Sequence, residues 1–456
     1  MRRLLKPFQF LQALRDPTGG LRSRLFSSLR KRPLLPALLA LTRPGRPGPQ
    51  TQQRASSGVY AAKVDTPKTV SPHHQVSFDN RKVYVPWEKG VTSSFHNIWL
   101  RDSCQCERCF HPVTKQRLLD TFAIPEHIRP ETVEAQAEGL HVVWANDGHT
   151  SLYSWAWLHQ HSYLPVLEKP AVVRRTYWGE EIADEPPTVE YDAVMAGDAA
   201  VGDWTSKISE FGFCFVSGVP VTPEATQALV ERIAFVRPTH YGGFWDFTSD
   251  MAKNDTAYSE DALRPHTDGT YFTDPPGLQL LHLLHHEGSG GASVLVDGFR
   301  AARELRERDR DAYKTLSRVR IPAHSAGNDD VFVRPAAMPR PVLSHDDTTG
   351  ELIQVRWNND DRSTMSRWGG RDPDVAIHQF YDAIRRWNGL LTRSDAQYWF
   401  RLQPGKAVIF NNWRLLHGRS NFTGSRRLCG AYINMDDFVS RMLLTNFGRD
   451  RLLEQI

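Results

Sequence analysis

The sequence predicts a mostly β protein with flanking helices, in which a double-stranded β-helix (jelly roll) over residues 191–456 follows a small β-rich module over residues 75–165. The jelly roll is indicated by many short strands with only a few covering helices. The module is set apart by residues 166–190, which are rich in proline and charge and are typical of a linker.

In the module, alternating apolar and polar residues predict short strands on both sides of a tight turn. Asn146-Asp147-Gly148 is typical of the turn of a β-hairpin, here between strands Leu140–Trp144 and Thr150–Trp155. The module's other expected strands are Val76–Phe78 and Lys82–Val85.

In the larger region, local signals predict the helices and strands. Thr222-Pro223 supplies an N-cap and a proline for the first turn of a helix, Glu224–Phe235. Gly277–His285 is apolar on both faces, as a buried central strand should be. The remaining expected strands are Phe213–Ser217, Gly290–Asp297, Lys406–Phe410, Trp413–His417 and Arg426–Ile433, and the remaining helices are Phe299–Val319 and Asp374–Leu391.

The charge of the chain is unevenly distributed. Residues 1–56 hold ten Arg and two Lys against one acidic residue, a local charge of +11. Subtracting this from the total of +4 leaves −7 for the remaining residues. An acidic protein of this kind is a poor candidate for binding nucleic acid, so we expect no nucleic-acid partner.

The basic opening segment, residues 1–56, is rich in arginine, contains serine and is nearly without acids, which is typical of a mitochondrial transit peptide. A disordered basic tail is the alternative. Its apolar run Leu34–Leu41 contains Pro36 and is too short to span a bilayer. We therefore expect a protein of the mitochondrial matrix with no membrane partner.

Three of the five cysteines, Cys104, Cys106 and Cys109, lie within six residues, which does not suit a disulfide framework. Three thiolates so close together suit a soft cation such as zinc, whose structural sites need a fourth ligand. His149, just after the predicted hairpin turn, is our expected fourth ligand, and His111 is the alternative. A loop of free thiols is the other interpretation.

His266 and Asp268 lie two residues apart in RPHTDGTYFT. On an extended strand, residues i and i+2 point to the same face, so the imidazole and the carboxylate converge. With a distant histidine, for which His417 is the candidate, they would form a 2-His-1-carboxylate triad that leaves open positions on iron(II). Arg426 follows His417 at a distance suited to gripping a second carboxylate.

The motifs WLRDSCQCERC, FTSDMAKNDTAY, HTDGTYF, VLVDGF, RWNNDDR and NWRLLHGRS, between about residues 95 and 445, resemble the iron(II)- and 2-oxoglutarate-dependent dioxygenases. Within them, they resemble the family of gamma-butyrobetaine hydroxylase and trimethyllysine dioxygenase. The resemblance implies that His266, Asp268 and His417 bind iron, that Arg426 holds the distal carboxylate of 2-oxoglutarate, and that Ser293 assists it. It also implies structural zinc on the cysteine cluster, ascorbate to keep iron reduced, and a homodimer.

The resemblance also implies how a small-molecule substrate is held. A quaternary ammonium group donates no hydrogen bond and is held on aromatic faces. The implied cage consists of Tyr241, Trp245, Tyr258 and Tyr432. Asn358, with Asn359 as the alternative, is expected to meet the carboxylate end of the substrate. Aromatic residues at such spacings are otherwise more often part of a core.

Three functions follow from these residues. The first is hydroxylation of free trimethyllysine at C3, the opening step toward carnitine; the second is hydroxylation of gamma-butyrobetaine; the third is binding of a methylated ammonium group without catalysis. Asp255 favours the first, because a carboxylate suits the α-ammonium group that only trimethyllysine carries, and the butyrobetaine branch typically has Asn there. Gly269 departs from the family, which we expect to have Thr there.

Overall fold

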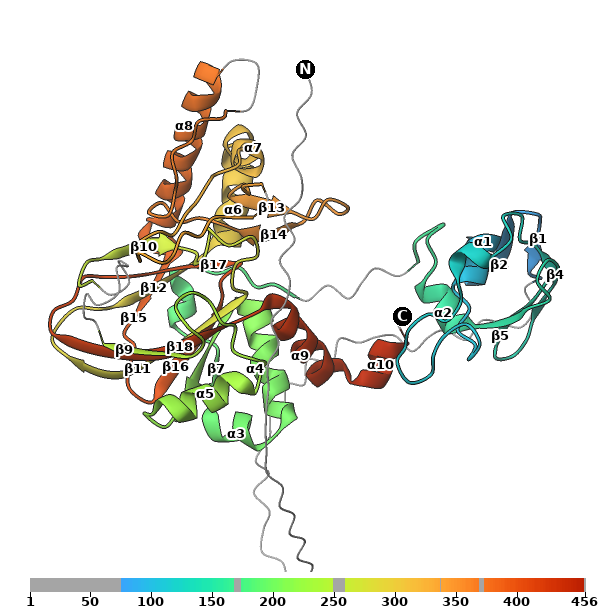
Figure 1. The fold of residues 1–456 in the computed structure, drawn as a ribbon, viewed down its shortest axis with the longest axis horizontal. Coiled ribbons are helices and arrows are strands. Elements are labelled where there is room, and N and C mark those ends of the chain that lie inside the picture. The colour runs from blue at the N-terminus through green and yellow to red at the C-terminus, as the bar shows by residue number, and fades with distance from the viewer. Residues whose placement is uncertain (1–74, 168–173, 249–258, 337, 369–372, 455–456) are drawn as a thin grey trace, which may run out of the picture. The chain divides into compact units, whose positions relative to one another are not determined.

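The computed structural model describes residues 75–167, 174–248, 259–336, 338–368 and 373–454 (Figure 1). The predicted transit peptide lies outside the described residues, as do two residues predicted to bind the substrate, Asp255 and Tyr258.

The N-terminal module contains two three-stranded sheets. Their strands are β1 (Ser77–Phe78), β2 (Lys82–Pro86), β3 (Thr92–His96), β4 (Pro130–Ala135), β5 (Gly139–Trp144) and β6 (Thr150–Ser154), accompanied by helices α1 (Asn97–Asp102) and α2 (Trp155–Gln160). Alternate residues of β2 and β5, among them Val83, Leu140 and Trp144, are fully buried and form the core of the module. The predicted hairpin is confirmed, with Gly148 at φ +62° in its turn.

Two larger sheets, counted among the described residues, form the centre of the remaining chain (Figure 1). The four-stranded sheet has the order β10-β17-β12-β15, with strands Leu263–His266, Leu415–Arg419, Ser293–Asp297 and Gln397–Phe400. The six-stranded sheet has the order β7-β8-β16-β11-β18-β9, with strands Thr188–Glu190, Phe213–Ser217, Lys406–Asn411, Leu278–Glu287, Ser425–Ile433 and Trp245–Thr248. A separate hairpin pairs β13 (Leu343–His345) with β14 (Leu352–Val355).

The alternation of side chains along the strands explains how these sheets pack. Phe213 and Phe215 of β8 belong to one apolar cluster with Leu295 of β12 and Leu415 of β17, so strands of both sheets contribute to a shared core. The intervening residue of β8, Cys214, belongs instead to a cluster with helices. Each sheet therefore has one face toward the shared core and one face toward helices.

Helices of two groups cover these outer faces. The six-stranded sheet is covered by α3 (Tyr191–Ala196), α4 (Asp198–Phe211), α5 (Pro223–Glu231) and α9 (Met435–Phe447). The four-stranded sheet is covered by α6 (Gly298–Arg308), α7 (Arg310–Arg318) and α8 (Pro373–Leu391). A short helix, α10 (Arg449–Leu453), follows α9. None of the described helices has both the length and the apolar composition that crossing a membrane requires.

The predicted elements that differ from the structure include two helices and one strand near the proposed site. The single helix expected over Phe299–Val319 is two helices, because the Asp309 carboxylate accepts hydrogen bonds from the backbone N–H groups of Asp311 and Ala312 and starts a new helix there. The helix after Thr222 ends at Glu231 rather than Phe235. The strand expected to end at His417 is β17, Leu415–Arg419, which places His417 in its middle.

The second half of the predicted linker is part of the packed structure. Trp178 is buried among Phe213 and Tyr398, and its indole N–H donates to the backbone carbonyl of Phe211 at 2.6 Å. Thr188–Glu190 forms β7, which pairs in parallel with β8. These residues therefore contribute to the core and to the six-stranded sheet.

Candidate active site

The structure brings His266, Asp268 and His417 together. Antiparallel pairing of β10 with β17 sets His266 opposite His417, and their ring centroids lie 4.3 Å apart. Oδ1 of Asp268 lies 3.2 Å from Nε2 of His266 and 3.6 Å from Nε2 of His417. One donor atom from each of the three side chains lies within 4.8 Å of the others, close enough to surround one ion.

Asp268 reaches this point by a route that the sequence argument did not foresee. Strand β10 ends at His266, so Asp268 does not lie on an extended strand with it as predicted. The side-chain amide of Asn412 holds the turn instead: its Oδ1 accepts from the Asp268 N–H at 2.8 Å, and its Nδ2 donates to the Asp268 carbonyl at 3.0 Å. Gly269 follows at φ +69°, and a Cβ there would lie 2.8 Å from atoms of Phe272 and Pro276. Glycine therefore suits this turn, although the resemblance predicted threonine.

Hydrogen bonds fix the orientation of the three side chains. Nδ1–H of His266 donates to the backbone carbonyl of Arg264 at 2.8 Å, which leaves Nε2 as the nitrogen that faces Asp268. The hydroxyl of Tyr432 donates to Oδ2 of Asp268 at 2.6 Å. The second carboxylate oxygen, Oδ1, therefore points at both imidazoles.

The charges of the cluster are strongly coupled. Burial alone would raise the pKa of Asp268, but His417, His266 and the Tyr432 hydroxyl outweigh burial and hold that pKa below its usual range. Burial lowers the pKa of His417 to about 4. For His266 burial also acts to lower the pKa, but the hydrogen bond and charge of Asp268 raise it to about 9. The site is thus built around an ionised carboxylate.

A cavity of about 170 Å³ opens beside this cluster. Every predicted site residue of the larger region that the structure describes lines it, namely His266, Asp268, His417, Arg426, Ser293, Tyr241, Trp245, Asn358 and Tyr432. Asn359, the alternative to Asn358, is exposed and does not line the cavity. Residues far apart in the sequence therefore converge on one cavity.

One part of the cavity is basic. Arg426 is only 4% exposed, and burial, reinforced by the nearby charge of Arg419, lowers its pKa to about 10. Both guanidinium groups lie over the ring of Phe422, at 5.7 and 4.6 Å. The neighbouring Arg427 points out of the cavity and pairs with Asp246 at 2.5 Å. Arg426 is thus the arginine that faces the cavity, and Tyr432 lies on the same face of β18, as the alternation predicted.

Another part of the cavity is aromatic. The rings of Trp245 and Tyr432 meet edge to face at 5.3 Å. Gly430, between Arg426 and Tyr432 on β18, makes room for the indole, because a Cβ there would lie 2.4 Å from Trp245. The hydroxyl of Tyr241 lies 2.9 Å from that of Tyr271, a cavity residue that the sequence argument missed.

Other residues of the site were also missed. Arg419, Gln279, Asp360 and Asp361 line the cavity, and Asn412 holds Asp268 without lining it. Asn412 and Arg419 stand in the motif NWRLLHGRS, and both acids stand in RWNNDDR, so the motifs contained the signal. Nothing in the linear sequence showed which of their residues turn inward.

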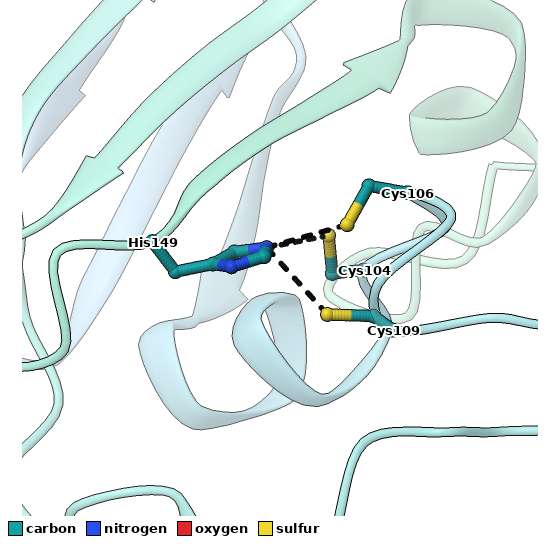
Figure 2. A group of neighbouring side chains, drawn as sticks. All are labelled: Cys104, Cys106, Cys109 and His149. Atoms are coloured by element: carbon teal, nitrogen blue, oxygen red, sulfur yellow. Dashed lines mark hydrogen bonds between the residues drawn. The ribbon is translucent and has the colours of Figure 1, made fainter.

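In the N-terminal module, the structure brings together Cys104, Cys106, Cys109 and His149 (Figure 2). Nε2 of His149 lies 3.3, 3.5 and 3.5 Å from the sulfur atoms of Cys104, Cys106 and Cys109, respectively. His111, the alternative fourth residue, is not part of the cluster, and its Nδ1 accepts from the backbone N–H groups of Val113 and Thr114.

A buried arginine stabilises this cluster. Arg101, 5% exposed, donates to the Cys109 sulfur at 3.4 Å and to Oδ2 of Asp147 at 2.7 Å. Oδ1 of Asp147 accepts a hydrogen bond from the backbone N–H of His149 at 3.0 Å. Arg101 therefore links the cysteine loop to the hairpin that carries His149.

Comparison with known proteins identifies the family. Residues 170–432 match the model of the taurine catabolism dioxygenase TauD, TfdA family. The chain belongs to this family. The predicted class, a 2-oxoglutarate-dependent dioxygenase, is thereby confirmed. Residues 74–159 match the model of the gamma-butyrobetaine hydroxylase-like N-terminal region.

Curated relatives of this dioxygenase cover most of its length. Trimethyllysine dioxygenase of Meyerozyma guilliermondii is 45% identical over 395 residues, 84% of this chain and 98% of the relative. The bovine relative, named trimethyllysine dioxygenase, mitochondrial, is 36% identical over 76% of this chain and 81% of its own. Gamma-butyrobetaine dioxygenase of Pseudomonas sp. (strain AK-1) is 32% identical over 79% of this chain and 93% of its own.

The donor sets of the two clusters suit different ions. Two imidazoles and one carboxylate on one side of a cavity suit iron(II) that keeps open positions for other ligands. Three thiols and one imidazole suit a tetrahedral zinc whose shell is complete. The dioxygenase thus has one cluster that could hold an ion for chemistry and one that could hold an ion for stability.

Proposed function

We propose that this dioxygenase hydroxylates N6,N6,N6-trimethyllysine at C3, giving 3-hydroxy-trimethyllysine, succinate and carbon dioxide in the first step of carnitine biosynthesis. The observation that carries the proposal is the match to a trimethyllysine dioxygenase over 98% of its length. The convergence of His266, Asp268 and His417 beside a cavity with aromatic walls supports it.

His266, Asp268 and His417 are the residues proposed to hold iron(II). Bound iron would supply the open positions at which 2-oxoglutarate and oxygen meet. The chain's own contribution is orientation: Arg264 fixes the tautomer of His266, Asn412 fixes the turn at Asp268, and Tyr432 leaves one oxygen of that carboxylate free to face the ion. Ascorbate is proposed to keep the iron reduced.

Arg426 and Ser293 are proposed to hold the distal carboxylate of 2-oxoglutarate. A guanidinium offers two parallel N–H donors to a carboxylate, and the burial of Arg426 makes each such bond stronger than it would be in water. Ser293 lies opposite Arg419 on the neighbouring strand and adds a hydroxyl to the cavity wall. The dicarboxylate would then extend from Arg426 toward the three metal-binding side chains.

Tyr241, Trp245 and Tyr432 are proposed to hold the trimethylammonium group on their ring faces, with Tyr258 completing the cage from outside the described residues. Asn358 is proposed to meet the carboxylate end of the substrate. Asp255, also outside the described residues, stays a predicted partner of the α-ammonium group.

For the remaining organisation, we propose that the two larger sheets form a double-stranded β-helix over residues 191–456. The module over residues 75–165 would then be a structural unit with zinc on Cys104, Cys106, Cys109 and His149. We further propose cleavage of a transit peptide within residues 1–56, location in the mitochondrial matrix, a homodimer, and no nucleic-acid or membrane partner.

The test is a substrate panel read by mass spectrometry. Purified protein with iron(II), 2-oxoglutarate and ascorbate should add one oxygen atom to trimethyllysine and release succinate in equal amount. Gamma-butyrobetaine is the second candidate, because a gamma-butyrobetaine dioxygenase is 32% identical. A higher catalytic efficiency on gamma-butyrobetaine would replace the proposed substrate. Succinate release that no trimethylammonium compound stimulates would contradict both.

A further inference from the structure

Two carboxylates besides Asp268, among the described residues, line the cavity: Asp360 and Asp361. Both belong to the segment that follows β14, where Asn358 also enters the cavity. The more a carboxylate in the wall of a cavity is removed from water, the more it gains from a cation of the ligand. These two acids therefore bear on which cations the cavity accepts.

Asp361 is the more firmly held of the two. Its Oδ2 accepts a hydrogen bond from the Thr270 hydroxyl at 3.0 Å, and Thr270 is itself 8% exposed. Its backbone carbonyl accepts from the His324 N–H at 3.0 Å. Asp361 is half-buried, whereas Asp360 is exposed and contacts the side-chain amide of Asn359.

The position of Asp361 is also close to the metal-binding residues. Thr270, which orients its carboxylate, lies two residues after Asp268 in the same turn. Asp361 and His266 also line the same cavity. A negative charge thus stands beside the reacting centre, on a different segment from the three proposed iron ligands.

The covalent structure of trimethyllysine places its positively charged α-ammonium group close to C3, the carbon that is proposed to be hydroxylated. Its α-ammonium nitrogen is two bonds from C3, about 2.5 Å, because C–C and C–N bonds are about 1.5 Å long. The trimethylammonium nitrogen lies four bonds from C3 in the other direction. When C3 faces the metal, the α-ammonium group must therefore lie next to the metal-binding residues, whereas the trimethylammonium nitrogen lies farther from them.

We propose that Asp361 binds the α-ammonium group of the substrate and so makes the cavity selective for an amino-acid substrate over one that lacks this group. The inference rests on the proposed function and deepens it. Asp361 would act from the described part of the cavity, whether or not Asp255 contacts the same group. Thr270 is a positioning residue in this arrangement, since it orients the carboxylate without touching the ligand.

The experiment varies the enzyme and the ligand together. 6-(Trimethylammonio)hexanoate has the carbon chain of trimethyllysine but lacks its α-ammonium group. Comparing the two ligands therefore measures the contribution of the α-ammonium group alone. The wild-type enzyme should favour trimethyllysine by tenfold or more in catalytic efficiency, and Asp361→Asn should reduce that preference at least tenfold. The Michaelis constant for 2-oxoglutarate should change less than threefold, since Arg426 is unaltered.

Further variants separate Asp361 from its neighbours. Thr270→Val should reduce the preference by a smaller factor, because the carboxylate remains but loses its orienting bond. Asp347→Asn, in the exposed turn between β13 and β14, is the matched control and should leave the preference unchanged. A loss of preference in Asp360→Asn or Asp255→Asn, with none in Asp361→Asn, would overturn the proposal.

A binding measurement covers the case in which Asp361→Asn no longer turns over. Dissociation constants of both ligands for the iron-loaded protein with 2-oxoglutarate, titrated without oxygen, need no catalysis. Equal weakening of both ligands would overturn the role of Asp361. If the wild-type enzyme oxidises neither ligand, the proposed function fails; if it oxidises both equally and binds them equally, only the present inference fails.

Discussion

The cavity cluster and the cysteine cluster differ in what surrounds their donor atoms. His266, Asp268 and His417 stand at the wall of a cavity, so an ion bound there would have one side toward ligands. The cysteine cluster contributes a fourth donor, His149, and would close around an ion completely (Figure 2). The comparison shows that the number of protein donor atoms around the ion distinguishes a reactive site from a structural one. Three donors leave positions open for ligands, whereas four complete the shell.

The largest expected effect concerns the cavity cluster, where a bound ion would have one side toward ligands. Asp268→Ala should lower turnover by at least about a thousandfold, because it removes one of three donors and leaves the two histidines without a counter-charge. Circular dichroism and the midpoint of thermal unfolding should show a folded protein. Wild-type activity in this variant would remove Asp268 from the proposed iron site.

The second expected effect concerns the basic wall of the cavity. Arg426→Ala should raise the Michaelis constant for 2-oxoglutarate by about 10- to 100-fold, the factor that charge-assisted hydrogen bonds of about 1.5–3 kcal/mol supply. Arg427→Ala is the matched control, since Arg427 pairs with Asp246 outside the cavity and should leave this constant nearly unchanged. The reverse result would assign the co-substrate to Arg427.

The third expected effect concerns the closed cluster. Metal analysis should find about one zinc per chain, and Cys106→Ser should lose it. Because a structural zinc stabilises the fold rather than the reaction, the variant should unfold at lower temperature while its activity below that temperature is kept. His111→Ala should retain zinc. Loss of activity in folded Cys106→Ser protein would contradict the division between the two clusters.

The smallest expected effect comes from a buried histidine that belongs to neither cluster. His282 is fully buried; its Nε2 accepts the Gly405 N–H at 3.1 Å, and its Nδ1 lies 2.7 Å from the Thr226 hydroxyl oxygen. Burial lowers its pKa to about 4. Since the folded protein binds this proton less readily than the unfolded chain does, His282 stabilises the fold above about pH 6.5.

The stabilisation should be lost as the pH falls from about 6.5 toward 4, with a slope of at most about 1.4 kcal/mol per pH unit. Denaturant titrations of the wild-type protein and of His282→Gln, compared across this range, measure it. The free energy of unfolding of the variant should depend less steeply on pH. Identical slopes would show that His282 does not titrate here.

Most residues of the candidate site could be predicted from short sequence motifs that contain metal-binding or charged side chains. His266, His417 and Arg426 are predicted by short motifs and by the resemblance that these motifs carry, and β11 is predicted by its continuous apolar run. The sequence analysis does not predict the helix break at Asp309, although aspartate is a common N-cap.

What could not be predicted depends on contacts between distant segments. Asp268 is held off the strand by Asn412, which follows it 144 residues later. Asp361 meets Thr270 across 91 residues, so its inward position follows only from the folded chain. The periodicity of apolar residues predicts only the helix or strand in which a residue lies. The hydrogen bonds of Asn412 to Asp268 and of Thr270 to Asp361 each join two distant segments, so periodicity cannot predict them.

Because His266 and His417 lie on paired strands, an ion at the proposed iron site would stabilise the fold as well as take part in the reaction. An ion bound by residues of β10 and β17 would add to the strand pairing that already joins the two ends of the long segment between them. Because the unfolded chain has no such preformed site, loading the ion would shift the balance toward the folded protein. Iron binding should therefore raise the temperature at which the protein unfolds, in addition to enabling the reaction.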